Sequence, residues 1–250
     1  MRSRRVRGRR VLVLLVLACA FVATGLGIAQ LTRPARSVDA AGVYLGTPHQ
    51  HSLLFLGASY TAGLGATSPH RGYAEQLAAT LGWPAEIAAV PGAGYLNAGP
   101  HGHDTFAEQL TRLPANLNPG LVVIQGGRND GGFTATRLRA AACATVRQAR
   151  RKYAEAEVVM LGNVPFSQRV SAGQKRVESA LTAASRSCRV AFVDPIAERW
   201  ITRQNAARLV GRVPGHPNDA GYSYIAQRLL ADLERLSHHR ILPAGQGKLA

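Results

Sequence analysis

The amino-acid sequence predicts an α/β domain in which a mostly parallel, five-stranded sheet lies between two layers of helices. Short apolar runs rich in β-branched residues recur from residue 50 onward, and segments with helical periodicity lie between them. The apolar runs do not alternate with polar residues, which is typical of strands covered on both faces. Alternation of strand and helix favours parallel strands joined by helical crossovers, so a three-layer arrangement is expected.

Five strands and four helices account for this pattern. The expected strands are Ser52–Leu56, Glu86–Val90, Leu121–Gln125, Val158–Leu161 and Val190–Val193. The expected helices are Tyr73–Leu81, Phe133–Tyr153, Gln174–Ser187 and, approximately, Ala220–Leu236. The last helix carries its leucines and Ile225 on one face, as an amphipathic helix does.

The composition allows one domain of catalytic size and excludes wholesale disorder. The chain has 250 residues, of which 46% are hydrophobic and 18% charged, so it can bury a sizeable core. Its formal net charge of +16 is concentrated near the start, where six arginines fall within the first ten residues. From Ala41 onward 22 basic and 13 acidic residues are scattered, without interleaved aromatic residues. This pattern argues against nucleic-acid binding.

The first 30 residues are predicted to form a signal peptide or an N-terminal membrane anchor. The arginines precede an uncharged apolar run of nineteen residues, Val11–Ala29. A basic segment followed by such a run is the layout of a secretory signal, and this run is also long enough to span a membrane. Its length favours an anchor, although Gly27–Ala29 offers a small-residue cleavage site. The rest of the chain is therefore expected to be secreted or held on the outer face of the cytoplasmic membrane.

Beyond this segment we expect a linker over residues 31–50, a catalytic domain over residues 51–240 and a tail over residues 241–250. Cys143 and Cys188 are the cysteines of the domain. In an exported protein they can form a disulfide that closes a loop of roughly 45 residues, and this is favoured over two buried thiols. The cysteine and histidine spacings match no metal site, so neither a metal nor a cofactor is expected.

Residues suited to acyl transfer follow the expected strands. Ser59 comes after the first strand, Gly92 after the second and Asn129 after the third, while His216 precedes the last helix. Ligands of such sheets bind beyond the carboxyl ends of the strands, so these residues could converge on one rim. Acyl transfer needs a hydroxyl nucleophile, an imidazole base and donors for an oxyanion. Each residue alone could serve a cap or a turn, and the interpretation rests on their order.

That order resembles the sequence blocks of the SGNH (GDSL-type) hydrolases, especially secreted actinobacterial members. Gly57–Tyr60 resembles the first block, Gly92 the glycine of the second and Gly127–Asp130 the third. His216–Tyr222 resembles the histidine block, and the similarity spans roughly residues 52–236. The resemblance implies a flavodoxin-like, three-layer α/β/α domain with esterase or related acyl-hydrolase activity and no cofactor.

The resemblance also implies roles for individual residues. Ser59 would be the nucleophile and His216 the general base. The backbone N–H groups of Ser59 and Gly92, with the side-chain amide of Asn129, would form the oxyanion hole.

Two positions depart from the family pattern. Ala58 replaces the aspartate of the usual Gly-Asp-Ser, and Val213 stands where the triad aspartate usually precedes the histidine by three residues. A backbone carbonyl could orient His216 instead, as in members thought to use a dyad. Asp219 is expected to cap the last helix, and Asp194 is a candidate carboxylate from elsewhere on the rim.

Three functions therefore stay open. The favoured one is an exported, monomeric serine esterase that acts on an acylated small molecule, lipid or polysaccharide through a Ser-His dyad or an incomplete triad. The second is a catalytically silent relative that binds an envelope glycan or lipid, which Ala58 and Val213 favour. The third is a binder of anionic polymers that uses the positive surface.

Overall fold

Five parallel strands form the sheet of the computed structural model, which describes residues 43–166 and 170–237. The strands are β1 (Leu53–Gly57), β2 (Ala85–Ala89), β3 (Leu121–Gln125), β4 (Glu157–Leu161) and β5 (Ala191–Val193). Their order across the sheet is β2-β1-β3-β4-β5, and every neighbouring pair is parallel. The predicted five-stranded α/β architecture is confirmed, and the sheet is parallel throughout.

The central strands are buried on both faces, which explains their unbroken apolar character. In β1, Leu53 and Phe55 belong to the core on one side of the sheet, whereas Leu54 and Leu56 belong to the core on the other. All five residues of β1 and of β3 are buried. Each buried leucine contributes about 1.5–3 kcal/mol. Strand β2, at an edge of the sheet, is only partly buried.

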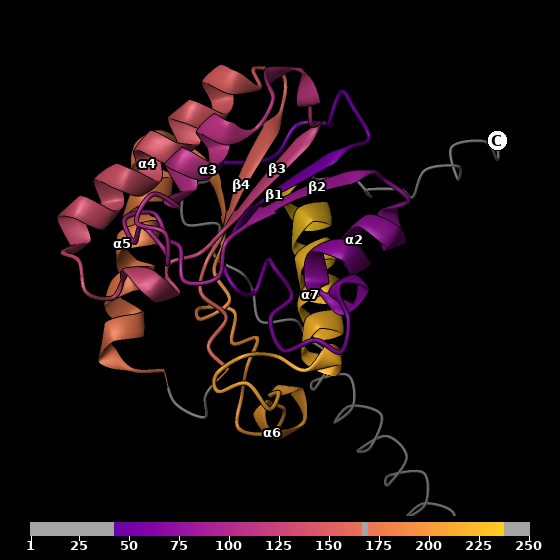
Figure 1. Ribbon diagram of the computed structural model, residues 1–250, viewed down its shortest axis with the longest axis vertical. Helices are drawn as coiled ribbons and strands as arrows, with labels where there is room; N and C mark the ends of the chain where they lie inside the picture. Colours follow the sequence, from indigo (N-terminus) through magenta and orange to yellow (C-terminus); the bar gives the residue numbers. More distant parts are fainter. Residues whose placement is uncertain (1–42, 167–169, 238–250) are drawn as a thin grey trace, which may run out of the picture. The chain divides into compact units, whose positions relative to one another are not determined.

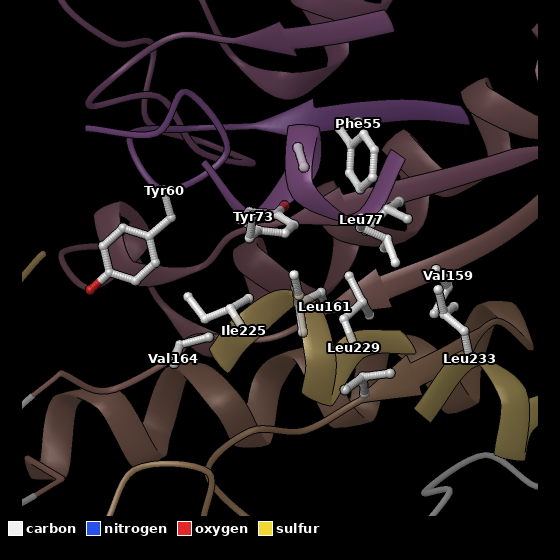
Figure 2. Packing of buried hydrophobic residues seen from close by; sticks show 14 of the residues in the cluster. Phe55, Tyr60, Tyr73, Leu77, Val159, Leu161, Val164, Ile225, Leu229 and Leu233 are labelled. Atoms are coloured by element: carbon white, nitrogen blue, oxygen red, sulfur yellow. The ribbon is translucent and has the colours of Figure 1, made fainter. Parts of the chain in front are cut away.

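Helices cover both faces of this sheet (Figure 1). Helices α2 (Tyr73–Leu81) and α7 (Asp219–Leu236) cover one face. Helices α3 (Phe106–Arg112), α4 (Ala135–Lys152) and α5 (Ala172–Cys188) cover the other. Figure 2 shows Phe55 of β1, Leu161 of β4 and Leu229 of α7 within the first core. The remaining elements are the short helix α6 (Ala206–Leu209) and the 3₁₀ turns η1 (Pro69–Arg71), η2 (Ala115–Leu117) and η3 (Arg128–Asp130).

Capping residues fix where several helices begin. The Thr105 hydroxyl and the Glu108 carboxylate form a reciprocal capping box that starts α3, a helix that was not predicted. Ser171 and Gln174 form a second box, so α5 begins two residues before the predicted start. Asn218 accepts a hydrogen bond from the Gly221 N–H at the start of α7. The prediction that Asp219 caps this helix is therefore wrong, because the cap lies one residue earlier.

In place of the predicted disulfide, the structure has Cys143 and Cys188 as free, buried thiols. Both thiols donate to the carbonyl oxygen of Ala184, over 3.2 Å from Cys143 and 2.8 Å from Cys188. They lie where α4 packs against α5, and each thiol is satisfied by this shared acceptor.

The predicted signal peptide or anchor lies outside the described residues, as do residues 31–42 of the linker and the tail. Within the part of the chain that the structure describes, no helix is long and apolar enough to cross a membrane. Leu45, in the predicted linker, is buried in the core and its N–H donates to the carbonyl of Leu236.

Candidate active site

Ser59 lies in the first turn after β1, and its side chain meets His216. The Ser59 Oγ is 2.9 Å from Nε2 of His216, although 157 residues separate them in sequence. The chain turns helically beyond the serine, with the Ala62 N–H donating to the Ala58 carbonyl. The Ser59 N–H, at the start of this turn, has no acceptor among the described residues. The hydroxyl of Ser59 can therefore act as a nucleophile while its N–H donates to an oxyanion.

A backbone carbonyl orients the His216 ring. Its Nδ1 lies 2.9 Å from the carbonyl oxygen of Pro214. Because a carbonyl oxygen only accepts, Nδ1 must carry the proton in this hydrogen bond. In the neutral ring Nε2 then has a free lone pair, directed at the Ser59 hydroxyl. This arrangement suits a general base.

The sequence Val213-Pro214-Gly215-His216 forms the turn that presents this carbonyl. The His216 N–H donates to the Val213 carbonyl over 3.0 Å, and Gly215 has a φ of +69°. Proline followed by a residue with positive φ is typical of a type II turn, whose second central position favours glycine. Val213 thus contributes its backbone, whereas its side chain supplies no carboxylate.

Tyr60 fastens this turn to the segment that carries Ser59. Its hydroxyl donates to the Gly215 carbonyl over 2.5 Å, and its ring meets the His216 ring edge-on at 5.2 Å. Burial raises the pKa of Tyr60 to about 12, despite the lowering effect of the Arg128 guanidinium beside it. Tyr60 is therefore a neutral donor at physiological pH. It is a site residue that the sequence analysis missed, although it follows Ser59 directly.

The second and third blocks are joined by the carboxylate of Asp130. It accepts from the backbone N–H groups of Tyr95, Leu96 and Asn97 at 3.0, 2.9 and 3.1 Å. Burial raises the pKa of Asp130, against the lowering effect of these hydrogen bonds. The segment after β3 is thereby fixed to the one after β2.

Asn129 and Gly92 each keep a free donor in this region. The Asn129 Nδ2 donates to the carbonyl of Ala93 over 2.7 Å, which uses one of its two N–H bonds. Gly92 has a φ of +88°, and its N–H has no acceptor among the described residues. Strand β1 pairs with both β2 and β3, so the segments carrying Ser59, Gly92 and Asn129 leave neighbouring strands at one edge of the sheet.

Neither the candidate Asp194 nor the nearby Asp219 hydrogen-bonds to His216. Asp194 accepts from the N–H groups of Ile196 and Ala197 after β5. Asp219 accepts from the backbone N–H and hydroxyl of Thr67 at 2.8 and 2.6 Å. Among the described residues no carboxylate hydrogen-bonds to the imidazole. The same residues contain no group of three potential metal ligands of the His, Cys, Asp or Glu type.

Comparison with known proteins identifies the family. Residues 55–224 match the model of the GDSL-like lipase/acylhydrolase family. The chain belongs to this family. It is 32% identical over 187 residues to a GDSL lipase of Mycobacterium tuberculosis, which covers 70% of this chain and 78% of the relative. The protein is thus an acyl hydrolase of the SGNH type, as the sequence blocks predicted.

Solved structures share the fold at lower identity. A family two carbohydrate esterase from Clostridium thermocellum, solved in complex with cellohexaose, superposes with a TM-score of 0.59. It is 21% identical, and the match covers 75% of this chain and 64% of that one. A salicylyl-acyltransferase from a tetracycline biosynthetic pathway superposes with a TM-score of 0.57 at 19% identity, covering 74% of this chain and 54% of that one.

Proposed function

We propose that this SGNH-type hydrolase is an exported serine esterase that works through a dyad of Ser59 and His216. One observation carries the proposal. The Ser59 Oγ lies 2.9 Å from Nε2 of His216, while the other ring nitrogen, Nδ1, keeps its proton by donating it to the Pro214 carbonyl. A base with its tautomer fixed in this way can accept the serine proton without a carboxylate.

In the proposed reaction the Ser59 Oγ attacks the carbonyl carbon of an ester while its proton passes to Nε2 of His216. The negative charge on the former carbonyl oxygen is stabilised by the N–H groups of Ser59 and Gly92 and by the free N–H of Asn129. Collapse of this intermediate expels the alcohol, which takes the proton from His216. Water, deprotonated by His216, then attacks the acyl-serine and releases the acid.

The substrate class follows from the relatives by analogy. The carbohydrate esterase that shares the fold was solved with cellohexaose, which supports an acylated polysaccharide as substrate. The lipase relative supports an acylated lipid.

The proposed export rests on the basic and apolar residues at the start of the chain. Cell fractionation should find the protein outside the cytoplasm, and a cytoplasmic location would remove that part of the proposal.

Hydrolysis of p-nitrophenyl acetate by the full chain tests the chemistry. Ser59→Ala and His216→Ala should each lower kcat at least about 10³-fold, because nucleophile and base act as one unit. Ser223→Ala and His51→Ala are matched controls. The Ser223 hydroxyl only donates to Gln76, and the His51 ring stacks on Trp83 before β1. Activity that survives Ser59→Ala would overturn the proposed nucleophile, and an inactive parent would favour a silent binding domain.

A further inference from the structure

Three residues that adjoin the proposed catalytic groups contact one another. Tyr60 follows Ser59, Gly215 precedes His216 and Arg128 precedes Asn129. The Tyr60 hydroxyl donates to the Gly215 carbonyl, and the Arg128 guanidinium lies close enough to this hydroxyl to lower its pKa. A guanidinium therefore lies where the three blocks meet.

The guanidinium lies directly over the backbone of Gly215. A Cβ atom at this position would come within 2.5 Å of an Nη atom of Arg128 and 3.2 Å of its Cζ. Only glycine leaves room for this approach, and the positive φ of Gly215 favours glycine as well. Arg128 therefore lies beside the turn that carries His216, and it is exposed to solvent.

Nothing in the described part of the chain neutralises this charge. Tyr60 stays protonated, because burial raises its pKa to about 12. The neighbouring Asp130 carboxylate is occupied by three backbone N–H groups, and the ion pairs of the described residues do not include Arg128. An exposed guanidinium that forms no ion pair with the described residues is suited to bind an anion.

The segment that leads to His216 adds to the positive potential. Residues 195–215 contain four exposed arginines: Arg199, Arg203, Arg208 and Arg212. The one acidic residue of this segment, Glu198, is buried and forms ion pairs with Arg228 and Arg235. An exposed segment that carries charge of one sign attracts ligands of the opposite sign.

We propose that Arg128 binds an anionic group of the substrate, a carboxylate or a phosphate, next to the ester bond that is cleaved. This inference rests on the proposed esterase function and narrows its substrate to anionic esters. The planar guanidinium can pair two N–H groups with two oxygens of either anion. Losing a hydrogen bond to a charged group should lower kcat/KM for such an ester about 10- to 100-fold.

The test compares phenyl esters that differ in whether, and on which side of the ester bond, they carry an anionic group. Phenyl acetate is neutral, its 3-carboxy and 3-phosphono derivatives carry the anion on the alcohol side, and phenyl hemisuccinate carries it on the acyl side. Wild type is measured beside Arg128→Gln, Arg128→Lys and Arg139→Gln. Arg139 is an exposed arginine of α4, so its replacement removes the same charge elsewhere.

In wild type and Arg139→Gln, kcat/KM should be higher for at least one anionic ester than for phenyl acetate. In Arg128→Gln this ratio should fall to about one. The derivative that responds identifies the anion and its side of the ester. Arg128→Lys keeps the charge but not the planar pair of N–H donors, so its preference for the anionic ester should lie between those of wild type and Arg128→Gln. Equal losses for neutral and anionic esters would reduce Arg128 to a positioning residue and overturn the proposal. So would the absence of any preference in wild type.

Binding separates this inference from the esterase proposal. If wild type hydrolyses none of the esters, the proposed function fails, and calorimetric titration with succinate and with phenylphosphonate still tests the anion site. Binding to wild type that is lost in Arg128→Gln would support the site without catalysis. The same affinity in both proteins, or none in either, would overturn it.

Discussion

Replacing Asn129 with alanine should cause two losses that can be measured separately. One N–H of its amide donates to the Ala93 carbonyl over 2.7 Å, and the other is free for an oxyanion. Loss of the first hydrogen bond should lower the free energy of unfolding by about 1 kcal/mol. Loss of the second donor should lower kcat by about 10²–10³-fold, equivalent to about 2.7–4 kcal/mol of transition-state stabilisation.

The matched control is Asn205→Ala. The Asn205 Nδ2 donates to the Trp200 carbonyl over 2.8 Å, and its Oδ1 accepts from the Thr202 N–H over 2.7 Å, so the substitution removes two hydrogen bonds in another segment. Both variants should lose stability in urea titrations, Asn205→Ala at least as much as Asn129→Ala. Only in Asn129→Ala should kcat for an aryl acetate fall, with little change in KM. If kcat of Asn129→Ala stays within about threefold of the control, the assignment of Asn129 to the oxyanion hole is refuted.

Two further predictions concern buried groups. Burial and the neighbouring Asp232 raise the pKa of Glu198 to about 7. Glu198 therefore makes its full contribution to stability at pH values below its pKa in the unfolded chain, and this contribution is lost as the pH rises through 7. Urea unfolding should therefore show a free energy that falls by up to about 3 kcal/mol between pH 5 and pH 8, and less in Glu198→Gln; an unchanged slope in the variant would contradict this. Burial also raises the pKa of the Cys188 thiol to about 12, so Ellman's reagent should detect Cys143 and Cys188 only after denaturation. If these two thiols do not react in the denatured, unreduced protein, they form the disulfide instead.

The sheet could be predicted because its strands leave a local signal. Residues Leu121–Gln125 are apolar or β-branched up to the final glutamine, and this run is the whole of β3. Helix α3 left a weaker signal, since it has only seven residues, although its Thr105–Glu108 capping box is readable in the sequence. The capping role of Asp219 was mistaken because two capping residues are adjacent. In the folded chain Asn218 occupies the cap position, and the Asp219 carboxylate instead accepts from Thr67, which lies 152 residues away in sequence.

The contact between Ser59 and His216 was expected from block order, and a backbone carbonyl was one expected partner of the imidazole, but which carbonyl it is could not be predicted. A Pro-Gly pair before a histidine predicts a turn, yet only the folded chain shows that the Pro214 carbonyl meets Nδ1. The contact of Arg128 with Tyr60 joins segments after β1 and β3 and has no local signature. Such contacts are tertiary, so patterns within one segment cannot reveal them.

Substituting a carbonyl for a carboxylate changes how charge is balanced during the proposed reaction. The Pro214 carbonyl fixes the tautomer of His216, but as a neutral dipole it stabilises the positive charge on the ring less than an aspartate would. The Arg128 guanidinium, packed on the adjacent Gly215, adds a second positive charge nearby. With a neutral ester, the charge that develops on His216 and the charge of Arg128 have no carboxylate partner among the described residues. An anionic substrate would supply a counter-ion, so its charge would offset that of Arg128 while His216 becomes protonated. The preference for anionic esters should for this reason appear in kcat as well as in KM, because the compensation is greatest in the transition state.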